Sequence, residues 1–273
     1  MELICPVCSR GLAADTHRYI CPKGHSFDRA KSGYVNLLQR QRHRQRGDDA
    51  EMAKARRDFL NAGYYQPLLD ALIQQALSHH VSRIADIGCG EGWYSCGVLH
   101  QLTEQGIAAE LTGIDISPEI LRFAAARAAK ELASSQTDWA VASVSRIPLA
   151  DNACDCILNL FAPCEPAEFG RILKKDGLLL RAVPLERHLW ELKQMIYDVP
   201  YENRPVCSAP EGFRLEQNLN ITYKITVPQS HLHALFAMTP YAHKTSPSDA
   251  AKLMKADQLE TTVSFGLLCC IKR

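Results

Sequence analysis

Residues 84–93 constrain the fold of this chain more than any other segment. An apolar run ends in an acid, Asp86, and three glycines follow at alternate positions before residues that can begin a helix. Because glycine has no side chain, a ligand can approach the backbone of such a turn closely. A second apolar run ends in another acid, Asp115, after one helical stretch. This βαβ pattern is typical of folds that hold a nucleoside by its ribose hydroxyls.

Strand-like and helical stretches alternate from residue 82 onward, which predicts an α/β doubly wound sheet. Two long strand-like runs near the C-terminus, with helical residues 229–238 and 247–257 between them, predict an antiparallel edge on an otherwise parallel sheet. The expected strands cover residues 83–87, 110–115, 138–142, 154–161, 177–183, 213–227 and 259–271.

The spacing of the glycines distinguishes between nucleotide cofactors. A nicotinamide site would have its third glycine one residue later, where Trp93 stands. Acid-x-Gly-x-Gly-x-Gly is instead the pattern of S-adenosylmethionine sites, and it predicts a class I methyltransferase fold with a Rossmann-like sheet. We expect Asp115 to accept the ribose hydroxyls and Ser143, after the third strand, to contact adenine. The loop itself contributes Asp86, Gly88, Gly90 and Gly92.

Four potential metal ligands lie near the N-terminus, as two pairs separated by twelve residues: Cys5, Cys8, Cys21 and His25. Pairs at this spacing predict one tetrahedral zinc ion, and four protein ligands make the ion structural. The segment has few apolar residues, so metal binding would supply its folding energy. Gly11 and Gly24 are expected to form the tight turns, and His17 is an alternative ligand. Unrelated free thiols are the other interpretation.

A basic stretch follows the zinc segment. Residues 29–47 contain six Lys and Arg residues and no acid, with Tyr34 and Asn36 interleaved. Arginines that engage phosphates and an aromatic that stacks on a base would suit a nucleic acid, whereas a basic solvated linker is the alternative. The expected RNA-binding arginines are Arg40, Arg42, Arg44 and Arg46. Asp48 and Asp49 are then expected to cap the first of two linking helices.

We therefore expect three segments: a zinc-binding RNA-recognition module over residues 1–38, a basic arm with linking helices over 39–80, and the methyltransferase domain over 81–273. No apolar run is long enough to span a bilayer, and the first residues lack the pattern of a signal peptide. Several of the eleven cysteines lie inside apolar runs, as in reduced proteins. These features predict a cytoplasmic protein that does not bind membranes.

Motifs along nearly the whole chain resemble the bacterial 23S ribosomal RNA guanine-N1 methyltransferases of the RlmA/RrmA family. The resemblance rests on the zinc ligand set and on residues 27–28, 33–38, 55–60, 65–68, 86–92, 162–164, 187–189 and 192–193. It implies methyl transfer to N1 of a guanine in a hairpin loop of 23S rRNA. It also implies a homodimer whose zinc modules help to form the RNA cleft. Cofactor contacts are implied for Tyr65, Gly90, Glu91 and His188.

The methyl group moves by in-line displacement from a sulfonium, so orientation should supply most of the rate. Guanine N1 carries a proton at neutral pH, and the base must leave any stack. A base or water must accept that proton, and the candidate residues are Asp155, Glu165 and His188. Asn159 could hydrogen-bond a base edge or could cap the end of its strand.

Two other functions compete with this interpretation. Pro163 and Cys164 resemble the nucleophile setting of cytosine-C5 methyltransferases, although a buried structural cysteine is the alternative identity of Cys164. A small-molecule methyltransferase would use the same fold, but a small substrate needs neither a zinc segment nor a basic arm. A non-enzymatic RNA-binding factor with a vestigial cofactor site is disfavoured by the intact glycine loop.

Overall fold

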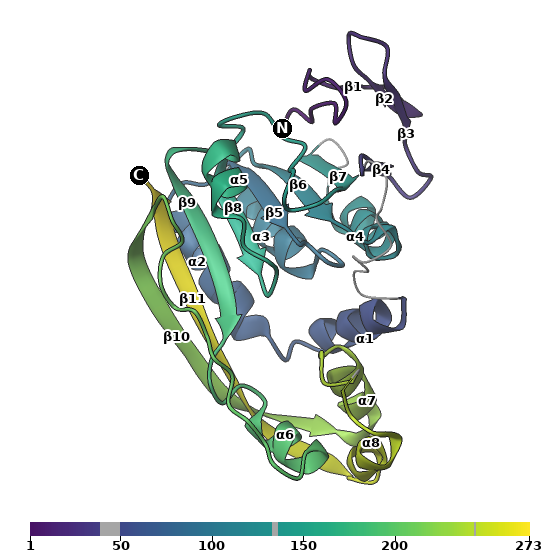
Figure 1. The fold of residues 1–273 in the computed structure, drawn as a ribbon, viewed down its shortest axis with the longest axis vertical. Coiled ribbons are helices and arrows are strands. Elements are labelled where there is room, and N and C mark those ends of the chain that lie inside the picture. The colour runs from purple at the N-terminus through teal and green to yellow at the C-terminus, as the bar shows by residue number, and fades with distance from the viewer. Residues whose placement is uncertain (39–49, 133–135, 243) are drawn as a thin grey trace.

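The computed structural model describes residues 1–38, 50–132, 136–242 and 244–273. Its main sheet has eight strands in the order β10-β11-β9-β8-β5-β6-β7-β4 (Figure 1). The bounds are β4 Tyr34–Asn36, β5 Arg83–Ile87, β6 Glu110–Asp115, β7 Thr137–Val141, β8 Cys154–Leu160, β9 Leu173–Pro184, β10 Phe213–Pro228 and β11 Gln258–Lys272. The strands from β4 to β9 pair in parallel, whereas β11 pairs antiparallel with both β9 and β10. The doubly wound sheet with an antiparallel C-terminal edge is confirmed.

The strand expected at 177–183 begins earlier, at Leu173. Leu173 pairs with Cys154, and the register then shifts before Leu178 pairs with Cys156. Asp176 adopts a φ of 58° within this irregular segment. The polar residues 174–177 read as a turn in the sequence, because a local pattern does not reveal a distant pairing partner.

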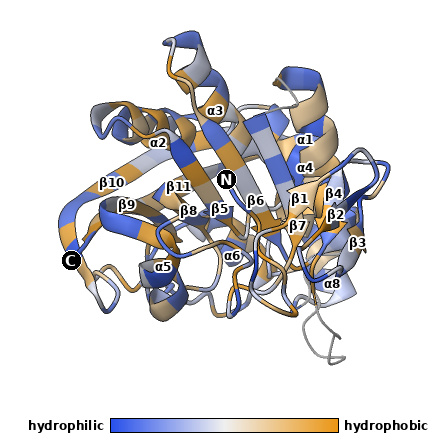
Figure 2. Cartoon of the chain, turned by 90° about the horizontal axis from the view of Figure 1, so that it is seen from above, coloured by the Kyte–Doolittle hydropathy of each residue, from blue (hydrophilic) through white to orange (hydrophobic). Residues whose placement is uncertain are grey.

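Helices α2 Gln66–Ser78, α3 Trp93–Glu104 and α4 Pro118–Glu131 cover one face of the sheet (Figure 1). Each buries a stripe at helical spacing, such as Leu68, Leu72 and Ala76 in α2. Figure 2 shows hydrophilic and hydrophobic residues on the same helices, as expected when only one side of a helix faces the core. The cap of α4 is formed by Ser117, whose Oγ accepts a hydrogen bond from the Ile120 N–H.

The N-terminal segment covers the opposite face. Its strands β1 Ala13–Ala14, β2 Arg18–Ile20 and β3 Ser26–Asp28 form a three-stranded antiparallel sheet. The connection from β7 to β8, all of it described, contains no helix, and the N-terminal segment packs there instead. Leu3 bridges Leu149, and the Tyr19 hydroxyl donates to Asp138 Oδ1 at 2.8 Å. We call residues 1–28 the zinc ribbon.

Strand β4 was not expected from the sequence. Tyr34 and Asn36, which are interleaved in the basic stretch 29–47, form an edge strand that pairs in parallel with β7. Val35 between them is fully buried against the sheet. The four arginines expected to bind RNA, Arg40, Arg42, Arg44 and Arg46, lie outside the described residues, as do Asp48 and Asp49.

The remaining helices are α1 Ala50–Asn61, α5 Pro166–Ile172, α6 Trp190–Ile196, α7 Gln229–Ala237 and α8 Pro247–Met254. Figure 1 shows α6, α7 and α8 gathered with α1 near the end of the long β10–β11 pair, beyond the carboxyl end of β9. Among the described residues, no helix combines the length and apolarity that crossing a membrane requires.

Candidate active site and metal centre

The four predicted metal ligands lie together. Their ligand atoms are all within 4.8 Å of one another. Cys8 Sγ lies 3.6 Å from Cys21 Sγ, and Cys21 Sγ lies 3.3 Å from His25 Nδ1. Tetrahedral zinc–thiolate bonds of about 2.3 Å imply ligand separations of about 3.8 Å, so the arrangement fits zinc. Because the set is complete with four protein ligands, the ion would be structural.

The turns of the zinc ribbon use one of the two predicted glycines. Gly24 adopts a φ of 81°, and its N–H donates to the Cys21 carbonyl at 2.8 Å. The other tight turn places Ser9, not Gly11, in the left-handed region with a φ of 56°. The Ser9 N–H donates to the Cys5 carbonyl at 2.8 Å, which curls the chain around the Cys5–Cys8 pair. Gly11 instead forms a bridge with Ile4.

The glycine loop lies at the carboxyl end of β5. Gly88, Gly90 and Gly92 adopt φ values of 83°, 57° and 79°, which favour glycine. A Cβ placed on Gly88 would lie 2.4 Å from Cβ of Ala162, so the β5 and β8 loops touch there. The sequence prediction of a tight turn with bare backbone is confirmed.

Asp86 lies beneath this loop and is 2% exposed. Its Oδ1 has no hydrogen-bond partner within the described part of the chain. Burial, with a smaller contribution from the Asp115 charge, raises the pKa of Asp86 to about 7. An orphaned, desolvated carboxylate oxygen fits a cationic ligand group. The methionine end of S-adenosylmethionine carries an ammonium group, so this residue fits the predicted cofactor.

The affinity for S-adenosylmethionine is therefore expected to depend on pH. Because the pKa of Asp86 is raised to about 7, this carboxyl is increasingly neutral below that pH. A cation prefers the carboxylate, so affinity should fall by about tenfold per pH unit below 7 and level off above it. In Asp86→Asn, calorimetric titrations from pH 5.5 to 8.5 should give weaker affinity without this slope. An equally steep slope in Asp86→Asn would contradict the assignment.

Asp115 ends β6 and holds the glycine loop. Its Oδ2 accepts a hydrogen bond from the Gly90 N–H at 3.0 Å, and its Oδ1 accepts one from the Ser117 N–H at 3.0 Å. A carboxylate oxygen has two lone pairs and can accept more than one hydrogen bond. The carboxyl end of the strand beside the glycine loop is where doubly wound sheets hold ribose. The ribose role of Asp115 stays a prediction that this placement permits.

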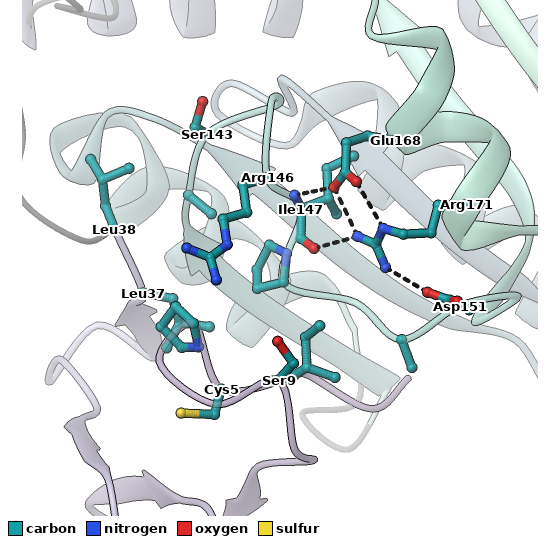
Figure 3. A pocket seen from close by; sticks show the side chains of 15 residues that line it. Cys5, Ser9, Leu37, Leu38, Ser143, Arg146, Ile147, Asp151, Glu168 and Arg171 are labelled. Atoms are coloured by element: carbon teal, nitrogen blue, oxygen red, sulfur yellow. Dashed lines mark hydrogen bonds and ion pairs between the residues drawn. The ribbon is translucent and has the colours of Figure 1, made fainter.

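Ser143 follows β7 and lines a cavity of about 640 Å³, whose walls come from the zinc ribbon, residues 37–38, the β7–β8 connection and α5 (Figure 3). Its hydroxyl shares a hydrogen bond of 2.8 Å with that of Ser145. On another wall of the cavity, Arg171 pairs with Glu168 at 2.8 Å and with Asp151 at 3.1 Å. The adenine contact of Ser143 stays a prediction.

Tyr65 and His188 form a buried pair. The Ser264 N–H donates to His188 Nδ1 at 3.2 Å, so a neutral ring carries its proton on Nε2. That proton lies toward the Tyr65 hydroxyl, 3.4 Å away, which leaves the tyrosine's own proton for another acceptor. Burial lowers the pKa of His188 to about 3, with a smaller contribution from Lys193. His188 is therefore a poor proton acceptor, whereas the pair can present a donor to an anionic ligand group.

Arg56 in α1 borders the candidate site, although the sequence did not indicate this. Its Nη1 lies 3.8 Å from where a Cβ on Gly90 would stand, so the guanidinium borders the glycine loop. Its positive charge also lowers the pKa of Tyr65 and of Tyr94, although burial raises both more strongly. The one signal for it in the sequence is that Arg56 lies in one of the segments that carry the family resemblance. Only the fold brings α1 to the loop.

One carboxylate oxygen of Glu91 is already engaged by a neighbouring side chain. Its Oε2 accepts two hydrogen bonds from Arg127, at 2.8 and 3.1 Å. Burial raises its pKa despite the Arg127 charge, and its Oε1 has no partner among the described residues. The implied cofactor contact would therefore use Oε1 or the backbone.

The structure disfavours one of the catalytic candidates, Asp155, by placement. Asp155 lies at the amino end of β8, where it accepts hydrogen bonds from the Ser82 and Arg83 backbone at 3.1 and 2.8 Å. This is the edge of the sheet opposite the glycine loop. Asn159 is fully buried, and its Nδ2 donates to the Ile87 carbonyl at 3.2 Å and to the Pro163 carbonyl at 3.0 Å. Its amide N–H groups therefore cap the strand end, whereas its Oδ1 has no partner among the described residues, so a hydrogen bond between Asn159 and a base edge stays a prediction. Glu165 stands at the start of α5.

Cys164 lacks the environment of a nucleophile. Burial raises its pKa, and this outweighs the lowering effect of the Arg181 charge, while the Glu165 charge adds a smaller increase. A nucleophilic cysteine needs a lowered pKa or an adjacent base. The cytosine-C5 alternative is therefore disfavoured, and we expect Cys164→Ser to keep methyl transfer.

Comparisons with known proteins agree with both parts of the chain, the zinc ribbon and the methyltransferase sheet. A family described as "RlmA, N-terminal" matches residues 3–46, and one described as "Methyltransferase domain" matches residues 84–177. The Bacillus subtilis (strain 168) protein named "Putative 23S rRNA (guanine-N(1)-)-methyltransferase YxjB" is 36% identical over 98% of this chain and 96% of its own length. The 23S rRNA (guanine(748)-N(1))-methyltransferase of Streptomyces fradiae is 36% identical over 70% of this chain and 66% of its own length.

Among solved structures, the YcgJ protein of Bacillus subtilis aligns with a TM-score of 0.50 and 16% identity. The alignment covers 75% of this chain and 97% of that protein, which shows a shared fold. The class I methyltransferase sheet and the N-terminal zinc ribbon are thus both confirmed. The chain belongs to the RlmA family of 23S rRNA (guanine-N1)-methyltransferases.

Proposed function

We propose that this chain transfers a methyl group from S-adenosylmethionine to N1 of a guanine in a hairpin loop of 23S rRNA. One observation carries the proposal: a zinc ribbon of the RlmA type is packed onto the sheet that also bears the glycine loop. A small-molecule methyltransferase would not need the zinc ribbon.

The residues around the glycine loop have separable tasks. When bound, S-adenosylmethionine supplies an electrophilic methyl group on a sulfonium. Asp86 would face its ammonium group, and Tyr65 with Arg56 would face its carboxylate. Asp115 would orient the ribose, so these contacts fix the direction of the in-line transfer. The proton on guanine N1 is left to water or to Glu165, because Asp155 and His188 are unsuited by position and by pKa.

The assay that tests the proposal uses purified protein and S-adenosylmethionine labelled on the methyl group. We expect label in a 23S rRNA transcript and none in a pool of small metabolites. Label confined to the metabolite pool would favour the small-molecule alternative.

The basic arm is expected to give the RNA affinity its salt dependence. Replacing Arg40, Arg42, Arg44 and Arg46 by alanine should lower the slope of log K against log salt by about 3, since each phosphate contact on single-stranded RNA contributes about 0.7. Replacement of the same four residues by lysine is the matched control and should keep most of the slope. Filter binding over a salt series measures both. A slope that stays the same in the alanine variant would make the arm a linker only.

The family resemblance further supports a homodimer and a cytoplasmic location. All eleven cysteines are free, which suits a reducing compartment. We also propose the division into an RNA-recognition module over residues 1–38, a basic arm with linking helices over 39–80, and the methyltransferase domain over 81–273.

A further inference from the structure

Phe161 is an exposed aromatic residue in a strained backbone conformation. It directly follows β8, it is 44% exposed, and its φ is 58°. A bulky residue with positive φ is a genuine outlier. Such backbone strain persists only where surrounding contacts hold the residue in place, and strained residues concentrate at functional sites.

Three contacts hold the Phe161 loop in this shape. The Phe161 N–H donates to the Ala182 carbonyl on β9 at 3.1 Å. Asn159 Nδ2 joins the Pro163 carbonyl to that of Ile87, and Ala162 packs against Gly88. The loop is therefore fixed to β5 and β9 at once, and the Phe161 ring has a defined position.

That position adjoins the cofactor site. Because β5 and β8 pair in parallel, with Asp86 opposite Leu158, the Phe161 loop and the glycine loop leave the same edge of the sheet side by side. The Phe161 ring lies 6.5 Å from that of Tyr94, whose buried hydroxyl has no partner in the described ranges. The ring also lies 5.0 Å from that of Phe265, which in turn packs against His188.

We propose that Phe161 is the platform on which the target guanine stacks when it leaves the RNA loop. This inference rests on the proposed function and names a substrate-contacting residue for it. A base taken out of its stack loses its neighbours, and an aromatic side chain replaces them. Any base can stack on an aromatic ring, so other groups must distinguish guanine from the other bases.

The test compares Phe161→Ala with Phe161→Tyr, which keeps an aromatic face. Both substitutions keep a side chain at the same positive φ, so the backbone strain is matched. Stacking on an aromatic ring is worth enough that Phe161→Ala should lower kcat/KM for a 23S rRNA transcript by about 10- to 100-fold. Phe161→Tyr should stay within about threefold of the wild type, because its ring can still stack. Phe161→Leu, apolar but not aromatic, should resemble the alanine variant.

A merely structural role would give different results. The affinity for S-adenosylmethionine should be unchanged in all three variants, and the melting temperature should fall by only a few degrees in Phe161→Ala, because the ring is 44% exposed. The platform is contradicted if Phe161→Ala keeps the wild-type kcat/KM, if Phe161→Tyr falls as far as Phe161→Ala, or if the loss follows cofactor affinity. A wild-type protein that forms no 1-methylguanine in 23S rRNA would overturn the proposed function itself, and the platform for guanine with it.

Discussion

Replacing Asp115 by alanine is expected to weaken the binding of S-adenosylmethionine by at least about a hundredfold. Hydrogen bonds to a charged group are worth about 1.5–3 kcal/mol each, and the predicted role has this carboxylate accept two from ribose. The same change releases the Gly90 and Ser117 N–H groups, which loosens the glycine loop. Isothermal titration calorimetry measures the effect.

Asp115→Asn is the matched control. The amide keeps one acceptor oxygen and the same shape but loses the charge, so its affinity should lie between those of the wild type and the alanine variant. Both cofactor-free variants should stay folded, although Asp115→Ala, which loses both backbone hydrogen bonds, should melt at a lower temperature than Asp115→Asn. Unchanged affinity in Asp115→Ala would remove this residue from the ribose site.

Loss of zinc is expected to affect RNA binding first and the stability of the whole chain as well. Cys5 and Cys21 are buried in the same apolar cluster as Ile87 and Ile114 of the main sheet. Unfolding of the zinc ribbon would expose that face of the sheet. We expect Cys21→Ser to lower the melting temperature by on the order of 10 °C, since each large buried side chain contributes about 1.5–3 kcal/mol.

The glycine loop lies at the carboxyl edge of the sheet and is held by Asp115, not by the zinc ribbon. Cys21→Ser should therefore lose RNA affinity more strongly than cofactor affinity at a temperature where the chain stays folded. Cys207→Ser, which changes a free cysteine outside the ligand set, should leave the melting temperature and the content of one zinc per chain unchanged. Equal loss of both affinities in Cys21→Ser would contradict a separate recognition module.

Local patterns in the sequence were sufficient for much of the fold and the site. The apolar run before Asp86 and the glycines after it define a strand and a turn without help from distant residues. The zinc ligands are likewise paired over three or four residues, so spacing alone identifies them.

Features that depend on distant pairing could not be predicted in the same way. Strand β4 is too short to show a period, and it exists because β7 offers an open edge. Asp155 was a candidate proton acceptor, yet it accepts backbone hydrogen bonds at the amino end of β8, whereas the glycine loop lies at the carboxyl end of the sheet. Arg56 reaches the loop from another helix, and the φ of Phe161 is imposed by contacts with β5 and β9.

The central claim is methyl transfer to N1 of one guanine in 23S rRNA. Mass-spectrometric mapping of 23S rRNA from a deletion strain, and from the same strain complemented with the wild-type or Asp115→Ala chain, tests it most directly. We predict that one 1-methylguanine is absent in the deletion strain, is restored by the wild-type chain, and is not restored by the variant. An unchanged 1-methylguanine map, or loss of a methylated cytosine instead, would contradict the claim.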